Sequence, residues 1–281
     1  MNNTFESEMS RICEIVILEI PLDELYPPEF HPFLVNDDEA MLRLARNIKR
    51  YGVREPGLAR IRNAEGGYEL LSGNRRKRAC ELAGLTSMPV IVSEMDDDES
   101  VIAMVDANLE HRQRLLHSER AWAYRIKMEA LNHSGVKGGT HSVDVLVEQT
   151  GESRTQIFRL IRLTELVPAL LDMVDVKRLA FNPAVELSYL TRKEQILVVD
   201  TMTKYEVKPS LSQAGRLKRA SQGNGLSISE IEDILSETKK PTDGFDTGDD
   251  FRRFFPASYT TKQIRDVIFE LLIGWQESQS H

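Results

Sequence analysis

The sequence predicts an α+β domain over about the first hundred residues, then an all-helical domain and a C-terminal helical segment. Short apolar stretches separated by turn residues continue to about residue 96, whereas later apolar residues recur at helical spacing. The later part also contains five copies of the Ser/Thr-x-x-Glu/Gln capping box, which begins helices. These are Ser153–Gln156, Thr191–Glu194, Ser210–Gln213, Ser227–Glu230 and Thr260–Gln263.

The elements of the first domain are predicted in chain order. Apolar residues at helical spacing predict a helix over residues 38–52, which ends at Gly52. Glycine also stops a second, shorter helix, at Gly84. The other predicted elements are a strand at 13–20, two strands at 56–71 around a Gly66-Gly67 turn, the short helix at about 75–82 and a strand at 88–92.

These elements divide the chain of 281 residues into parts of different character. That length suits two domains, each with its own core. The segment TKKPTDGFDTGDD is polar and contains proline and glycine, so it predicts a linker. The predicted parts are an α+β domain at 1–96, a helical domain at 97–237, the linker at 238–250 and a C-terminal helical segment at 251–281.

Composition indicates a cytoplasmic globular protein. A hydrophobic content of 41% and a charged content of 28% are ordinary for that class, and no apolar run is long enough to span a membrane. The first residues carry acids where a signal peptide carries basic residues. Two cysteines, Cys13 and Cys80, give no disulfide framework, and the six histidines lack metal-ligand spacing. We therefore predict no metal held by protein ligands and no membrane contact.

Residues 111–163 are basic, although the whole chain has a net charge of −8. Nine Lys and Arg residues stand against five acids in this stretch. Such a segment indicates a phosphate-binding surface, while mixed helix surfaces also produce this imbalance by chance. The basic residues are Arg112, Arg114, Arg120, Arg125, Lys127, Lys137, Arg154, Arg159 and Arg162.

The stretch LSGNRRKRACELAG, residues 71–84, has the pattern of an anion site. A strand, a glycine and a helix follow one another, so the unpaired N–H groups of the first helical turn face outward. Gly73 allows the backbone to approach a ligand closely. Arg75 and Arg76 oppose the helix dipole unless a negative group lies nearby, which predicts either a bound phosphate or pairing with surface acids.

Residues 142–163 have the spacing of a helix-turn-helix. Leu146 and Val147 are predicted to pack inward, Gly151 to make the turn, and Ile157 and Leu160 to anchor the second helix. The outward residues of that helix suit base edges and phosphates of double-stranded DNA. They are Arg154, Thr155, Gln156, Arg159 and Arg162. A plain helical hairpin is the alternative.

Three segments resemble motifs of one protein family, in the family's order. LSGNRRKRACELAG resembles the GERRxRA box, NIKRYGVREP the G-x-x-x-P segment, and ANLEHRQRLLHSERAWAY the ENxxR segment with its following helix. Over residues 20–235 the chain thus resembles the ParB family of chromosome and plasmid partition proteins, closest to those of mobile elements. The resemblance implies a ParB/sulfiredoxin-like N-terminal domain followed by a helix-turn-helix domain.

The resemblance also implies a site for CTP with Mg²⁺, in which the GERR box holds the triphosphate. The glutamate of that box is Asn74 here, and Ala107 precedes Asn108 where the second glutamate belongs. Aligning on Arg112 instead shifts that segment by one residue, and neither Asp106 nor Glu110 takes the family position. CTP hydrolysis is therefore expected to be weak at most, with no catalytic residue assigned. The implied nucleotide residues are Gly52, Pro56, Ser72, Gly73, Asn74, Arg75, Arg76, Asn108 and Arg112.

Partners follow partly from the family and partly from the C-terminal segment. Residues 261–275 place apolar side chains at helical spacing, which predicts either a homodimer contact, as in the family, or packing onto the same chain. The family's N-terminal peptide contacts a ParA-type ATPase, but residues 1–11 are mostly acidic, which gives that partner little support. The expected location is the cytoplasm, on the nucleoid or a plasmid.

Three functions compete. A DNA-binding partition protein with a nucleotide-sensing domain is the preferred interpretation. A helix-turn-helix transcriptional regulator of a mobile element would share the same architecture. A nucleotide-dependent enzyme on the sulfiredoxin-like fold ranks last, because Asn74 replaces the cysteine that sulfiredoxin needs and Cys80 falls inside the following helix.

Overall fold

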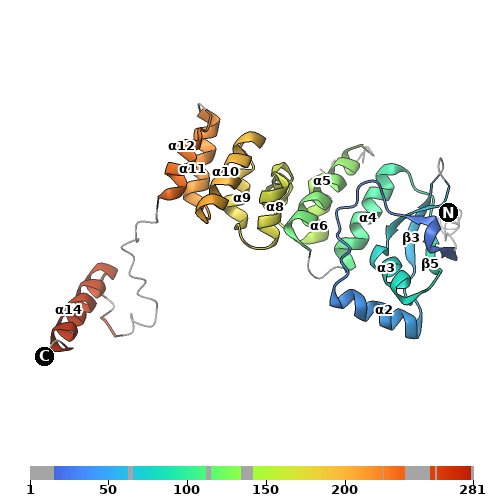
Figure 1. The fold of residues 1–281 in the computed structure, drawn as a ribbon, viewed down its shortest axis with the longest axis horizontal. Helices are drawn as coiled ribbons and strands as arrows, with labels where there is room; N and C mark the ends of the chain where they lie inside the picture. The colour runs from blue at the N-terminus through green and yellow to red at the C-terminus, as the bar shows by residue number, and fades with distance from the viewer. Residues whose placement is uncertain are drawn as a thin grey trace, which may run out of the picture.

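The structure is a computed structural model. Figure 1 shows an elongated arrangement in which the sheet lies at the N-terminal end and the helices follow one another along the long axis. The described residues are 16–62, 66–111, 115–133, 142–223, 225–237, 254–256 and 258–279.

A mixed five-stranded sheet forms the N-terminal part, in the order β1-β5-β3-β4-β2. The pair β1–β5 and the pair β3–β4 are antiparallel, whereas β3–β5 and β2–β4 are parallel. The predicted strands at 56–71 and 88–92 are confirmed, and residues 17–20 of the predicted strand at 13–20 belong to β1. The strands are β1 (Ile17–Pro21), β2 (Leu25–Tyr26), β3 (Gly57–Ile61), β4 (Tyr68–Ser72) and β5 (Ser87–Val92), with a 3-10 turn η2 (Leu22–Glu24) before β2.

Two helices, α2 (Glu39–Tyr51) and α3 (Asn74–Ala83), pack against each other and complete this part. Asp38 caps α2 by accepting a hydrogen bond from the Met41 amide at 2.7 Å, and Gly52 ends the helix with a φ of 73°. Both helices match the predicted positions. Their buried side chains share one cluster with the strands, which includes Met41, Ile48, Leu70, Ala79 and Met88.

Where the structure describes the chain after residue 96, its regular elements are helices, as predicted. In Figure 1 they succeed one another away from the sheet, and the last one, α14, is set apart from the others. None of the described helices is long and apolar enough to cross a membrane. The helices are α4 (Asp97–His111), α5 (His117–His133), α6 (Ser142–Thr150), α7 (Arg154–Arg162), η3 (Leu163–Glu165), α8 (Pro168–Asp175), α9 (Phe181–Leu187), α10 (Arg192–Tyr205), α11 (Leu211–Gly223), α12 (Ile228–Ser236) and α14 (Thr261–Gln279).

Four of the five predicted capping boxes close in both directions. In each, the hydroxyl accepts from the amide three residues later, and the Glu or Gln side chain accepts from the capping residue's amide. The box at Ser153 is only half formed, because its hydroxyl accepts from the Gln156 amide at 3.2 Å but the return bond is not among the described contacts. The Gln156 side chain is therefore not used as a cap.

The two parts of the chain meet in a continuous core. Phe33 and Leu71, from the N-terminal part, are buried in the same cluster as residues of the helical part. Glu119 of α5 is buried and accepts hydrogen bonds from the amides of Leu34 at 2.8 Å and Leu116 at 2.9 Å. The segment at 27–38, which leads from the sheet into α2, is thereby attached to α5.

Candidate nucleotide and DNA sites

The N-terminus of α3 is built by a close approach of two backbones. Strand β4 ends at Ser72, and Gly73 caps α3 with a φ of 106°, a conformation that favours glycine. A Cβ on Gly73 would lie 3.1 Å from the Gly57 Cα, and a Cβ on Gly57 would lie 3.1 Å from the Ser72 carbonyl oxygen. Glycine at both positions therefore allows the turn to sit directly against β3.

The first turn of α3 contains basic side chains and no acid. The Arg76 guanidinium donates to the carbonyls of Glu55 at 2.6 Å and Pro56 at 2.7 Å, and lies 3.9 Å from the Glu55 carboxylate. Arg75 lies 3.6 Å from Asp38. Both arginines thus have acidic neighbours, as the pairing alternative predicts, while their phosphate role stays a prediction.

Burial dominates the electrostatics of Arg76. It lowers the pKa of the guanidinium, and the nearby Glu55 carboxylate opposes that shift. Arg78, two residues further along α3, has a raised pKa because Asp37 and Glu81 both accept its hydrogen bonds. Of Arg76 and Arg78, the one nearer the helix start is therefore the more desolvated, which strengthens any contact it makes with an anion.

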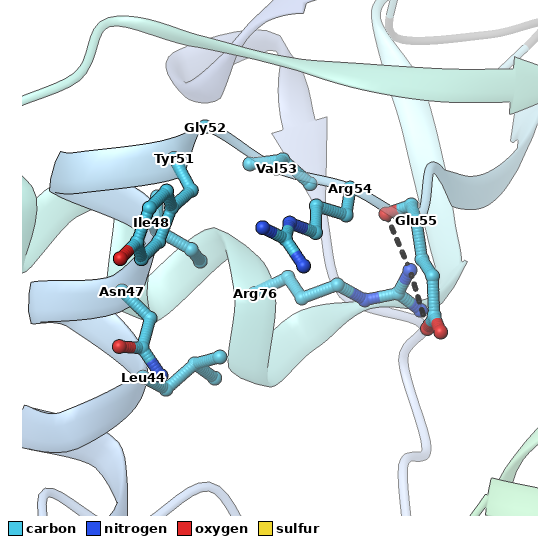
Figure 2. A pocket seen from close by; sticks show the side chains of 9 residues that line it. All are labelled: Leu44, Asn47, Ile48, Tyr51, Gly52, Val53, Arg54, Glu55 and Arg76. Atoms are coloured by element: carbon cyan, nitrogen blue, oxygen red, sulfur yellow. Dashed lines mark hydrogen bonds and ion pairs between the residues drawn. The ribbon is translucent and has the colours of Figure 1, made fainter.

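A cavity of about 390 Å³ lies beside Arg76, between α2 and the start of β3 (Figure 2). This volume is within the range of small-molecule sites. Leu44, Ile48 and Val53 form its apolar part, and the Tyr51 ring at its edge lies about 5.1 Å from the guanidinium groups of both Arg50 and Arg54. The complete lining is Leu44, Asn47, Ile48, Tyr51, Gly52, Val53, Arg54, Glu55 and Arg76.

The structure brings together most of the implied nucleotide residues. Gly52 and Arg76 line the same cavity, Pro56 is bonded to Arg76, and residues 72–76 form the turn. His31 is a neighbour that sequence reasoning missed, with its Nε2 atom 3.2 Å from the Asn74 amide nitrogen. Such a neighbour comes from a loop about forty positions earlier in the chain, so no local spacing could reveal it.

Helix α4 packs against β4 and carries the second implied segment. The Asn108 amide donates to the Met104 carbonyl at 2.8 Å, within its own helix. The Oδ1 atom of Asp106 accepts bonds from Lys127 and from Gln149, which ties this carboxylate oxygen to the neighbouring helices. Across the described residues, no group of three or more His, Cys, Asp or Glu side chains could hold a metal ion. Arg112 lies outside the described residues.

Helices α6 and α7 form the predicted pair of helices. Leu146, Ile157 and Leu160 are fully buried, and Val147 is half-buried against the same core. Gly151 makes the connection with a φ of 71°, and its amide donates to the Val147 carbonyl at 2.9 Å. The packing leaves the opposite face of α7 toward solvent.

The candidate DNA residues on α7 have different surroundings. Arg154 pairs with Asp144 of α6. Arg159 donates to the Asn182 side chain at 2.6 Å, and Arg162 donates to the Ser188 carbonyl at 2.9 Å. Thr155 is exposed, whereas Gln156 is half-buried.

Aromatic rings support two of these arginines. Arg159 lies 5.1 Å from the Phe181 ring centre and Arg162 lies 4.3 Å from that of Tyr189. Together with α5, this face of α7 borders a hollow of about 580 Å³. Its lining includes one residue that sequence reasoning missed, Phe158, which is exposed.

Helix α14 carries the predicted apolar residues in two environments. Ile264 is buried, and Val267 and Ile268 are half-buried. Leu271 and Trp275 are more than half exposed, at 67% and 61%. The C-terminal half of the helix therefore presents apolar surface to solvent.

Comparisons with known proteins agree with the motifs in the N-terminal part. The family model for the ParB N-terminal domain matches residues 6–109. The nucleoid occlusion protein of Listeria innocua is 31% identical over 180 residues, which cover 64% of this chain and 60% of the relative. That of Bacillus subtilis is 29% identical over 178 residues, covering 63% and 60%. The matched region thus spans less than two thirds of these relatives.

Solved structures give weaker likenesses. Truncated Caulobacter crescentus ParB complexed to its centromeric parS site is 19% identical, with a TM-score of 0.42 over 79% of this chain and all of that one. The same protein complexed with CTP-gamma-S is 23% identical, with a TM-score of 0.33 over 67% and 99%. At these TM-scores the superpositions carry no weight in the assignment. Residues 6–109 therefore match the ParB N-terminal domain, and over 180 residues the chain is similar to nucleoid occlusion proteins.

Proposed function

We propose that this protein binds a specific site on double-stranded DNA, as a partition or nucleoid-occlusion protein of ParB type. Helix α7 would enter the major groove, and α6 would cross the phosphate backbone. The observation that carries the proposal is the exposed face of α7, where Arg159 and Arg162 are held in place by side chains and carbonyls of neighbouring elements. Pre-positioned arginines lose little entropy when they bind.

Replacing Arg159 with alanine is expected to weaken specific DNA binding by roughly tenfold to a hundredfold, the usual cost of losing one guanidinium contact. The site would first be selected from a random duplex pool with the full chain. Fluorescence anisotropy at fixed salt would then compare the variant with the wild type. Arg192→Ala, at the exposed start of α10, is the matched control. Equal binding by Arg159→Ala and the wild type would contradict the proposal.

We further propose that the N-terminal domain binds CTP through the turn at residues 72–76 and the adjacent cavity. The support is the desolvated Arg76, the acid-free first turn of α3 and the size of the cavity. The phosphates would lie at the helix start, where backbone N–H groups and Arg75 favour negative charge. The triphosphate would supply the negative charge that the first turn of α3 lacks. Asp106 is committed to Lys127, so the proposal assigns it no metal.

The exposed half of α14 is proposed as the contact between two copies of the chain. Replacing Leu271 with aspartate is expected to convert a dimer into a monomer, because it would bury a charge in the contact. Sedimentation velocity of the full chain measures this change. Leu211→Asp, at the start of α11 and also half exposed, is the control. A Leu271→Asp variant that sediments as the wild type would exclude α14 as the contact.

A further inference from the structure

Phe158 is an apolar side chain in the middle of a polar reading face. It is 51% exposed on α7, while its neighbours Ile157 and Leu160 are fully buried. Thr155 lies three positions before it and Arg162 four positions after it, so the three share one face of the helix. The core therefore does not explain Phe158, because the side chain points away from it.

The polar side chains around Phe158 are already engaged within the protein. Arg159 is bonded to Asn182 and Arg162 to Ser188, on α9 and directly after it. Arg154 pairs with Asp144. Among the described contacts, neither Phe158 nor Thr155 has a hydrogen-bond, ionic or ring partner. The centre of this face thus offers a phenyl ring and a threonine methyl group, with fixed cations beside them.

The base edge that fits such a surface is that of thymine. In the major groove the 5-methyl group of thymine is the apolar feature among donors and acceptors, and phenylalanine and threonine methyl groups are suited to contact it. The flanking arginines suit phosphates or guanine, and so fix the ring over one base step. Burying an exposed phenyl ring against a methyl group also removes apolar surface from water.

We infer that Phe158 is a specificity residue that reads the methyl group of a thymine within the DNA half-site. The inference rests on the proposed DNA-binding function and makes it more definite. It names an A·T pair, read in the major groove, at the position that faces the centre of α7.

The test removes only the methyl group. A site is selected from a random duplex pool with the full wild-type chain, and each thymine in it is replaced in turn by deoxyuridine. At one position the wild type is expected to bind the uracil duplex about fourfold more weakly, the effect of one buried methyl group. In Phe158→Ala this preference disappears, so the variant binds the thymine and uracil duplexes equally. Ile196→Ala, 51% exposed on α10, keeps the preference.

The outcomes separate the inference from the function on which it rests. If no sequence is enriched from the pool, both the DNA-binding proposal and the inference fail. If a site is enriched but no uracil substitution changes wild-type affinity, the inference is overturned while sequence-specific binding stands. The same holds if Phe158→Ala keeps the full preference for thymine. A wild type that binds every uracil duplex as tightly as the thymine duplex overturns the inference without any variant, so this outcome does not depend on how a substitution affects folding.

Discussion

Replacing Arg76 with alanine is expected to weaken CTP binding by the full chain at least about 100-fold, the effect of losing roughly 3 kcal/mol from a buried charged contact. Arg76 combines two roles. Its guanidinium lies at the start of α3, where we place the phosphates, and it also holds the segment before β3 through the carbonyls of Glu55 and Pro56. Alanine removes the positive charge and releases that wall of the cavity (Figure 2).

Isothermal titration calorimetry with CTP, ATP and GTP, each with Mg²⁺, measures this effect. Arg76→Lys is expected to retain part of the affinity, because lysine keeps the charge but lacks the planar fork of donors that matches phosphate oxygens in pairs. Arg43→Ala serves as the matched control, since Arg43 lies on α2 and is exposed in its pair with Glu39. If Arg76→Ala binds CTP as tightly as the wild type, the turn at residues 72–76 is not part of the nucleotide site. If the wild type binds none of the three nucleotides, the proposed site itself is wrong.

Local signals explain what the sequence could predict. Helices α2 and α3 were predictable because each has a chain-local stop, Gly52 and Gly84, and α2 also has a strong apolar stripe. The capping boxes depend on residues only three positions apart. Four of them closed as expected. The box at Ser153 is half formed because the Gln156 side chain adopts a conformation in which it does not bond back to the Ser153 amide.

Long-range contacts explain what the sequence could not predict. His31 reaches Asn74 from a loop about forty positions earlier, and Glu119 reaches the Leu34 amide across a longer separation. No periodicity marks such pairs, because they depend on how the segment at 27–38 lies on α5. The arginines of α7 were predicted as outward residues, but their fixation by Asn182 and Ser188 depends on the position of α9.

Phe158 shows a different limit of the sequence. Within an amphipathic helix an apolar residue is normally assigned to the core, and its neighbours Ile157 and Leu160 are core residues. The helical spacing alone places Phe158 on the same face of α7 as Thr155 and Arg162. Only the structure shows that the Phe158 ring lies outside the core, and this exposure is what points to a role in binding.

Replacing Lys127 with alanine is expected to lower the free energy of unfolding by about 1–3 kcal/mol, because it removes the buried cation from a half-buried ion pair. Lys127 is only 2% exposed. Its ammonium group donates to Asp106 and, at 2.6 Å, to the Gln149 side chain, and the Gln149 amide in turn donates to Asp106 at 2.7 Å. Alanine leaves the carboxylate without its cation and creates a cavity beneath it.

Urea unfolding followed by circular dichroism measures the change, with Lys204→Ala as the control. Lys204 makes a comparable pair with Glu232 on the surface, so its loss is expected to cost less than about 1 kcal/mol. The double variant Lys127→Met with Asp106→Leu is expected to regain most of the stability, because apolar side chains of similar size replace both charges. Equal destabilisation by Lys127→Ala and Lys204→Ala would show that the Lys127–Asp106 pair contributes no more to the free energy of unfolding than a surface pair.

The position of this network also links its stability to the proposed DNA binding. Lys127 lies on α5, Asp106 on α4 and Gln149 on α6, so the three side chains join the helix that packs on β4 to the helix that precedes α7. Loosening α6 changes how α7 is presented while leaving its own side chains intact. Lys127→Ala is therefore expected to weaken specific DNA binding as well, and the double variant to recover it in parallel with stability. If the double variant regains stability but not DNA binding, the polar contacts themselves are needed to position α7.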